Sequence, residues 1–201
     1  MAEIKTLFVT KLYQAHIEDA PLAELKLACL FIAEEDEAGQ AWSREKGYKG
    51  FTSYASLNDL PRRDPAFAEL KKHLDKHAAA FAKALSFDLG GRKLRLDSLW
   101  VNVMAPGGVH TGHIHPHSVL SGTFYVDVPK QASSLKLEDP RLPLMMAAPA
   151  RLEDAPEAER AFIYVTPRAG DLLLWESFVR HEVPPSAAKQ VRISISFNYA
   201  F

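Results

Sequence analysis

The chain has 201 residues, enough for one domain with a full hydrophobic core. Hydrophobic residues make up 47% and charged residues 24%, and the formal net charge is −1, so no basic surplus points to nucleic acid. No run of 18 apolar residues is present, so we expect no membrane span and a cytoplasmic protein. Cys29 is the single cysteine, which excludes an intrachain disulfide and a cysteine-rich zinc site. Any metal would be held by histidines and carboxylates.

The first 91 residues are expected to be mostly helical. Residues 4–9 could form a first strand. The spacing of apolar residues then predicts one helix from Asp19, its N-cap, to roughly Glu37. A second helix is predicted from Pro65 to Leu85, with Asp64 as the N-terminal cap. His73 and His77 are four residues apart on it, but no third ligand is near, which favours an ordinary surface role.

Residues 42–64 are expected to be irregular, with room for a short strand. Loops of this length in compact domains are often functional. The segment contains four aromatic residues that could form a lid or ordinary packing, with packing favoured: Trp42, Tyr48, Phe51 and Tyr54.

From residue 92 onward the periodicity changes to that of strands. Six segments are predicted to be strands: 92–104, 119–128, 161–167, 171–177, 181–185 and 191–201. Residues 139–160, with four prolines, are expected to form a surface excursion. Helices followed by strands, without alternation of the two, predict an α+β fold that is mainly β, with a small antiparallel barrel or jelly roll. We expect one domain over 1–201, with residues 92–201 as its β core.

Two of these strands have one polar and one apolar face, because strand side chains alternate. In the last strand the polar face consists of Arg192, Ser194, Ser196 and Asn198. In the strand 119–128 the corresponding face consists of Val119, Ser121, Thr123, Tyr125 and Asp127. These faces could line a water-accessible cavity inside a barrel, or the polar face could simply be exposed to solvent.

Four histidines lie within eight residues: His110, His113, His115 and His117. An H-x-H pair on an extended strand points two imidazoles the same way, and a third histidine at a distant strand end can complete a facial set of metal ligands. We predict His113, His115 and His181 as these ligands, with His110 and His117 as partners that orient them. Polar-loop or proton-transfer histidines are the alternative.

Arg192 is predicted to lie on the polar face of the last strand. A buried arginine needs an anion, and its planar fork suits a carboxylate. Ser194 lies on the same face and could donate a further hydrogen bond. An exposed arginine paired with an acid is the alternative. Asn102 and Tyr125 are predicted to line the pocket by hydrogen bonding, with Trp100 beside them.

The order H-x-H, distal His and R-x-S resembles the Fe(II)/2-oxoglutarate-dependent oxygenases. More closely, the chain resembles a bacterial family of 2-oxoglutarate-Fe(II) oxygenases in the segments SLWVNVMAPGGVHTGHIHPHSVLSGTFYVDVP, LEDPRLPLMMAAP, AGDLLLWESFVRHEVPPS and RISISFNY. With the region GYKGFTSYASL, these segments cover most of the chain from residue 42 onward. The resemblance implies a double-stranded β-helix with the two N-terminal helices packed on it.

The resemblance also implies a function. Fe(II) would bind His113, His115 and His181, and 2-oxoglutarate would chelate the iron, with its far carboxylate on Arg192 and Ser194. The cosubstrate would be decarboxylated to succinate while a C–H bond of the substrate is attacked, and the protein would bind, orient and exclude side reactions.

The sequence departs from the wider superfamily of Fe(II)/2-oxoglutarate-dependent oxygenases at His115, where the usual motif has Asp or Glu. Three neutral imidazoles leave the site more positive, which favours anionic ligands. A carboxylate from elsewhere could bind the metal: Asp127, Glu176 or Glu182. Alternatives are a three-histidine cupin-like dioxygenase that does not use 2-oxoglutarate, a zinc enzyme, and a non-enzymatic barrel that binds a metal or a small anion.

The expected partners are molecular oxygen and a small-molecule or peptide substrate whose identity the sequence does not reveal. The final strand, ending in SFNYAF, could be an exposed edge that pairs with a second copy to form a homodimer.

Overall fold

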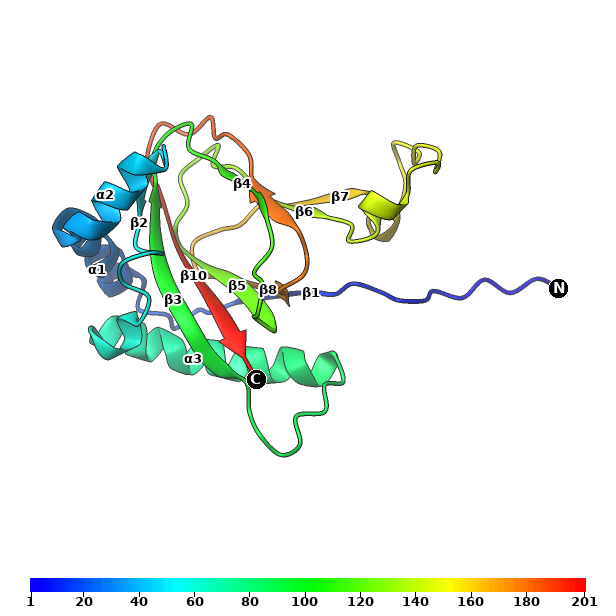
Figure 1. Cartoon of the computed structure of the whole chain (residues 1–201), viewed down its shortest axis with the longest axis horizontal. Helices are drawn as coiled ribbons and strands as arrows, with labels where there is room; N and C mark the ends of the chain where they lie inside the picture. The colour runs from blue at the N-terminus through cyan, green and yellow to red at the C-terminus, as the bar shows by residue number, and fades with distance from the viewer.

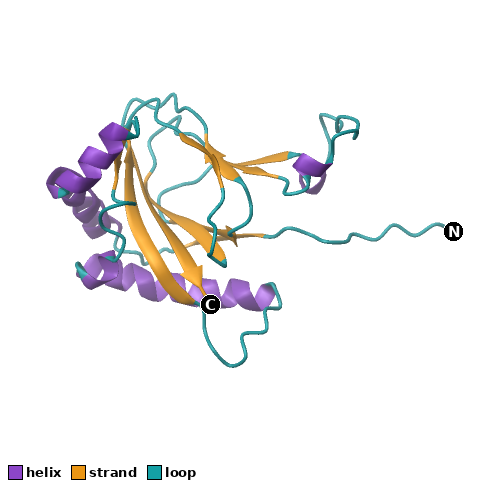
Figure 2. Cartoon of the chain, in the orientation of Figure 1, coloured by secondary structure: helices purple, strands orange, loops and turns teal.

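The computed structural model describes all 201 residues and contains a mainly β fold with three α-helices (Figures 1 and 2). The helices are α1 Leu22–Glu35, α2 Glu37–Glu45 and α3 Pro65–Ala84. The strands are β1 Leu12–His16, β2 Gly50–Thr52, β3 Arg95–Met104, β4 His110–His113, β5 Leu120–Asp127, β6 Leu135–Glu138, β7 Phe162–Val165, β8 Asp171–Glu176, β9 His181–Val183 and β10 Arg192–Ala200. Three short 3-10 turns are Leu60–Arg62, Leu142–Leu144 and Glu157–Glu159.

The strands form two sheets. The larger sheet has six strands in the order β1-β8-β5-β10-β3-β2, and the smaller has four in the order β4-β9-β6-β7. Every named strand pair is antiparallel. β1 and β2 come from the first 91 residues but complete the two ends of the larger sheet, so the N-terminal part is integral to the β core. The predicted mainly β jelly-roll architecture is confirmed.

The hydrophobic core has two parts, one on each face of the larger sheet. On one face, residues of α1 and α3 such as Leu25 and Phe67 pack with Ile193, Ile195 and Phe197 of β10. On the other face, side chains of β5, β8 and β3 pack against β6 and β9 of the smaller sheet. The polar face of β10 lies on this second side, where Arg192, Ser194 and Asn198 are buried. The alternative of a solvent-exposed polar face is therefore wrong.

The N-terminal predictions need three corrections. Residues 4–9 are exposed and form no strand; β1 begins at Leu12, where pairing with β8 becomes available. The first helix has Pro21 rather than Asp19 at its N-cap and ends at Glu35. The chain turns at Asp36, whose side chain accepts a hydrogen bond from the Gly39 N–H and so begins α2, within a segment expected to be partly irregular.

The second helix is confirmed. Asp64 accepts a hydrogen bond from the Ala66 N–H at 2.7 Å, and Pro65 occupies the first helical position. His77 lies beside Tyr13, whose hydroxyl is 2.8 Å from its Nδ1, and is no part of a metal-ligand group. No helix has the length and apolar character to cross a membrane.

All six predicted strands are present, but two short ones, β4 and β6, were missed. The expected exposed edge at the C-terminus is wrong. β10 pairs with both β3 and β5 in the middle of the larger sheet, and its Phe197 and Tyr199 are buried. The free edges of this sheet are β1 and β2.

Candidate metal centre and anion site

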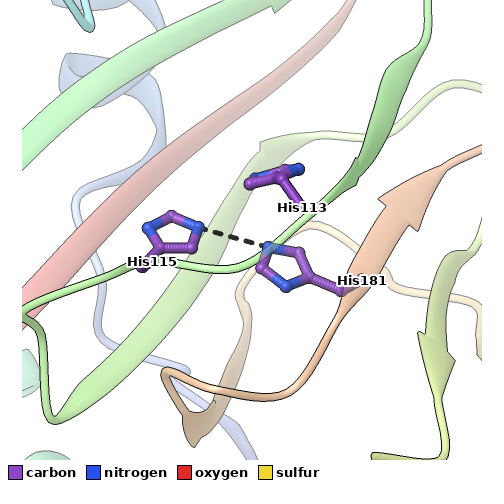
Figure 3. A group of neighbouring side chains, drawn as sticks. All are labelled: His113, His115 and His181. Carbon is purple, nitrogen blue, oxygen red and sulfur yellow. Dashed lines mark hydrogen bonds between the residues drawn. The ribbon is translucent and has the colours of Figure 1, made fainter. Parts of the chain in front are cut away.

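The three predicted metal ligands meet at one point between the sheets. His113 ends β4 and lies directly opposite His181, the first residue of β9. His115 follows β4, where its N–H donates to the Ser177 carbonyl at 3.0 Å. One ligand-capable atom from each imidazole lies within 4.8 Å of the others, and Figure 3 shows the three rings gathered together. These residues could hold a metal ion.

Backbone hydrogen bonds orient two of the three rings. Nδ1 of His113 lies 2.7 Å from the Thr111 carbonyl oxygen, and Nδ1 of His181 lies 3.0 Å from that of Val179. When each Nδ1–H donates to its carbonyl, the Nε2 lone pair is free for a cation. The Nε2 atoms of His115 and His181 are 3.3 Å apart, so a cation between them could take the place of a shared proton.

Burial keeps the rings of His115 and His181 neutral. Burial, with a smaller effect of the neighbouring histidines, lowers the pKa of His115 to about 4 and that of His181 to about 3. Both rings are therefore uncharged at pH 7, which is the form that binds a metal.

No carboxylate joins the three histidines. Asp127 pairs with Lys26 at 2.6 Å, and Glu182 pairs with Lys136 at 2.7 Å. Glu176 is half-buried, and burial raises its pKa, but it is not part of the group. The ligand-capable set in this chain therefore consists of imidazoles alone.

The two remaining histidines of the cluster differ in placement. Nε2 of His110 lies 2.6 Å from the Tyr48 hydroxyl, and burial together with the charge of Arg192 lowers the His110 pKa to about 3. His117 has a φ of 68° and is exposed, outside the group of three. The left-handed backbone there interrupts the strand alternation that was expected to bring His117 to the same side.

Arg192 is a buried guanidinium without a carboxylate partner. It is 5% exposed, its Nη1 donates to the Ser133 carbonyl at 3.3 Å, and its Nε has no partner. Its Cζ lies 5.8 Å from the centre of the Tyr125 ring. Burying an unpaired charge is costly, so this position suits an anionic ligand such as a carboxylate.

The other predicted pocket residues lie opposite one another on three neighbouring strands, β3, β10 and β5. Ser194 lies opposite Asn102 on β3 and opposite Tyr125 on β5, and all three are buried. The Asn102 amide already accepts from the Thr52 hydroxyl at 2.9 Å and donates to that of Ser196 at 3.0 Å. Asn102 thus belongs to a polar network within the protein.

Sequence reasoning missed Trp175 as a site residue. Its indole is 2% exposed, packs edge-on to His181 with ring centres 4.6 Å apart, and has no partner for its Nε1–H. The alternation in DLLLWES places Trp175 and Leu173 on one face of β8, a signal that could have identified it.

A row of aromatic rings extends from the metal centre toward the surface. Trp100 stacks on His115 with ring centres 5.9 Å apart, Tyr54 packs on Trp100 at 5.2 Å, and Trp42 packs on Tyr54 at 6.1 Å. Tyr54 is 52% exposed, whereas Phe51 is buried in the core. The aromatic segment therefore divides, with Phe51 in the core and Tyr54 as an exposed member of this row, between Trp100 and Trp42.

Comparison with known proteins identifies the chemistry. A family model described as "Putative 2OG-Fe(II) oxygenase" matches residues 98–198, just over half of the chain, including all three histidines and Arg192. No curated protein matches the sequence.

Solved structures share the fold. A Pseudomonas putida prolyl-4-hydroxylase is 20% identical with a TM-score of 0.63, covering 96% of this chain and 94% of that one. The 2-oxoglutarate-dependent carbocyclase SnoK from nogalamycin biosynthesis is 15% identical with a TM-score of 0.66, covering 94% and 79%. HygX from Streptomyces hygroscopicus, solved with nickel and 2-oxoglutarate, is 15% identical with a TM-score of 0.60, covering 96% and 82%.

The residues present fit the two groups that this family uses: neutral imidazoles for Fe(II), and a buried unpaired arginine for the anionic cosubstrate. The chain belongs to the 2OG-Fe(II) oxygenase family, enzymes that use Fe(II), 2-oxoglutarate and molecular oxygen.

Proposed function

We propose that this enzyme is a hydroxylase that holds Fe(II) on His113, His115 and His181 and 2-oxoglutarate between that metal and Arg192. The observation that carries the proposal is the pairing of three converging imidazoles with a buried guanidinium that has no carboxylate partner and an unpaired Nε. Bound Fe(II) and 2-oxoglutarate, with molecular oxygen, would supply the chemistry: one oxygen atom goes to succinate as carbon dioxide leaves, and the other is inserted into a substrate C–H bond.

The histidines act by orientation and charge. The Thr111 and Val179 carbonyls hold the rings of His113 and His181 in the tautomer that points Nε2 inward. Because all three ligands are neutral, the charge of a bound Fe(II) is not reduced by the protein. An anionic cosubstrate is then attracted more strongly than at a site with a carboxylate ligand.

The anion site acts by charge and by unpaired donors. Arg192 can bind the far carboxylate through two N–H groups, and Ser194 lies on the same strand face. The Nε1–H of Trp175 and the Oγ of Ser133 are also buried without partners. Each unsatisfied donor costs about 1–3 kcal/mol, which a bound anion could recover.

The substrate is proposed to reach the metal along the aromatic row from Tyr54 to Trp100. The similar structures include a prolyl-4-hydroxylase and a carbocyclase of nogalamycin biosynthesis, so small molecules and peptides are both candidate substrates. We further propose a cytoplasmic location, consistent with the buried free thiol of Cys29.

The test is calorimetric titration of 2-oxoglutarate into protein loaded anaerobically with Mn(II), a redox-silent substitute for Fe(II). We expect metal-dependent binding that weakens at least about 100-fold in Arg192→Ala, because a charge-assisted bidentate contact is lost. Trp175→Phe keeps an aromatic ring at this position but removes the Nε1–H donor. It should weaken 2-oxoglutarate binding about 5- to 30-fold. Trp42→Phe, at the far end of the aromatic row, is the matched control.

Absence of binding to the Mn(II)-loaded wild type would contradict the proposal. It would favour a second candidate, a three-histidine dioxygenase that uses oxygen without 2-oxoglutarate. The specific observation in favour of that candidate is the lack of a carboxylate among the converging side chains. Substrate-dependent oxygen uptake without succinate formation would identify it.

A further inference from the structure

The N-terminal arm, defined as residues 1–10, makes no backbone hydrogen bond to the rest of the chain. It extends away from the body of the molecule as a continuation of β1 (Figure 1). Every residue of the arm is exposed. An extended segment with unpaired N–H and C=O groups is a template for pairing with another strand.

The side chains of the arm are unusually apolar for this degree of exposure. Ile4, Leu7, Phe8 and Val9 are 98%, 64%, 93% and 57% exposed. The run TLFVT, residues 6–10, combines β-branched and aromatic residues, which favour a strand. The only ion pair within the arm joins Lys5 and Glu3 at 3.6 Å, so little charge opposes association.

The arm is not one uninterrupted extended segment. Phe8 has a φ of 55°, in the left-handed region that bulky residues rarely adopt, so the backbone bends there. Pairing over the whole arm would require Phe8 to take an extended conformation.

We propose that the arm is an interface for a second copy of this chain, in which two arms pair antiparallel across a two-fold axis and extend the larger sheet through its free β1 edge. β1 pairs only with β8, so its outer side is available. A two-fold axis places an identical strand antiparallel to the arm, which makes the contact self-complementary and closed.

The finger formed by residues 139–160 between β6 and β7 adds to this surface. It projects toward the same side as the arm in Figure 1, and its Leu144, Met146 and Leu152 are 81%, 93% and 78% exposed. At roughly 100 Å² for each apolar side chain, arm and finger from two copies would bury about 1,400 Å². That area lies within the roughly 1,200–2,000 Å² of stable interfaces.

The groove between α1 and α3 is the competing surface. It has a volume of about 700 Å³ and is lined by Leu27 and Phe31 with Glu24, Asp64 and Glu69. It lies on the helical side, away from the arm (Figure 1). Contact between each arm and the groove of the other copy would also close a two-fold dimer, so substitutions in the groove distinguish the two arrangements.

The oligomeric state tests the proposal. Size-exclusion chromatography with light scattering should give a dimer for the wild type. The double variant Leu7→Asp/Phe8→Asp should weaken dimerisation at least about 100-fold. The matched control, Leu27→Asp/Phe31→Asp, introduces the same charges in the groove and should remain dimeric. Circular dichroism and Mn(II) binding should be unchanged in both variants, which separates this result from the test of the proposed function.

Cross-linking supplies an independent readout. In a Cys29→Ala background, single cysteines placed in turn at Ile4, Lys5, Leu7 and Val9 should give an interchain disulfide at the position nearest the two-fold axis. A monomeric wild type at about 100 μM would overturn the proposal. The proposal would also be overturned if the arm variant remained dimeric and the groove variant became monomeric.

Discussion

Burial sets the charge of individual side chains at the metal centre. His110 and His181 have pKa values lowered to about 3, in both cases mainly because burial disfavours the imidazolium, whereas an unperturbed histidine titrates near 6.5. Arg192 keeps its charge, since a guanidinium does not lose its proton in proteins. The candidate site therefore combines neutral imidazoles with one fixed positive charge, which favours an anion.

The lowered histidine pKa values predict how stability depends on pH. Below pH 6.5 the unfolded chain binds a proton on each of these histidines, but the folded chain does so only near pH 3. The contribution of these neutral histidines to the free energy of unfolding is fully present above pH 6.5 and is lost as the pH falls toward 3. The loss is up to about 1.4 kcal/mol per pH unit for each histidine.

Urea unfolding of the metal-free protein at pH 7.0 and 5.5, with a chelator present, measures this loss. The free energy of unfolding should fall clearly between the two values, and His110→Gln should reduce the difference. His117→Gln, a change at an exposed ring, should leave it unaltered. Equal stability of the wild type at both pH values would contradict the prediction.

At the scale of elements, β5 and β10 separate the two parts of the core. Their alternation directs Ser194, Ser196 and Tyr125 toward the smaller sheet and Ile195 and Phe197 toward the helices. Gly122 of β5 lies opposite Phe197, and a Cβ there would be 2.5 Å from the Phe197 ring and 2.6 Å from the Leu173 carbonyl oxygen. The ring fills the space that a side chain would need.

Gly122→Ala should therefore destabilise the protein by about 1–3 kcal/mol through overpacking. For a chain of this size, that corresponds to a fall in Tm of roughly 2–10 °C. Phe197→Leu shortens the opposing side chain, so the glycine substitution should cost less in that background, as a double-mutant cycle by calorimetry would measure. Additive effects in the cycle would mean that the ring does not exclude the side chain.

At the scale of the whole molecule, the candidate site joins the two sheets. His113 and His181 come from β4 and β9 of the smaller sheet, whereas Arg192 and Ser194 come from β10 of the larger one. A metal that binds only the folded arrangement must stabilise the complete fold by mass action.

Adding Mn(II) at about 100 times its Kd should raise the free energy of unfolding by about 2.7 kcal/mol and Tm by roughly 5–10 °C. His113→Ala and His181→Ala should abolish the rise in differential scanning calorimetry, whereas His73→Ala on α3 should retain it. A rise that persists without His113 and His181 would place the metal elsewhere.

The sequence by itself determined the properties that depend on local pattern. Period-2 alternation identified the polar face of β10, Asp64 with Pro65 marked the start of α3, and the H-x-H pair with His181 predicted three imidazoles that could hold a metal. These signals lie within a few residues of one another, or within a motif that a family shares.

Only the tertiary structure decided which distant groups meet. It placed β10 at the centre of the sheet and β1 at the edge, left the Nε1 of Trp175 and the Nε of Arg192 without partners, and kept His117 outside the group of three. Strand order and burial follow from the pairing of strands that are far apart in the sequence. Local strand propensity does not specify which strands pair. A single positive φ, as at His117, is enough to end an alternation that the residue types alone would continue.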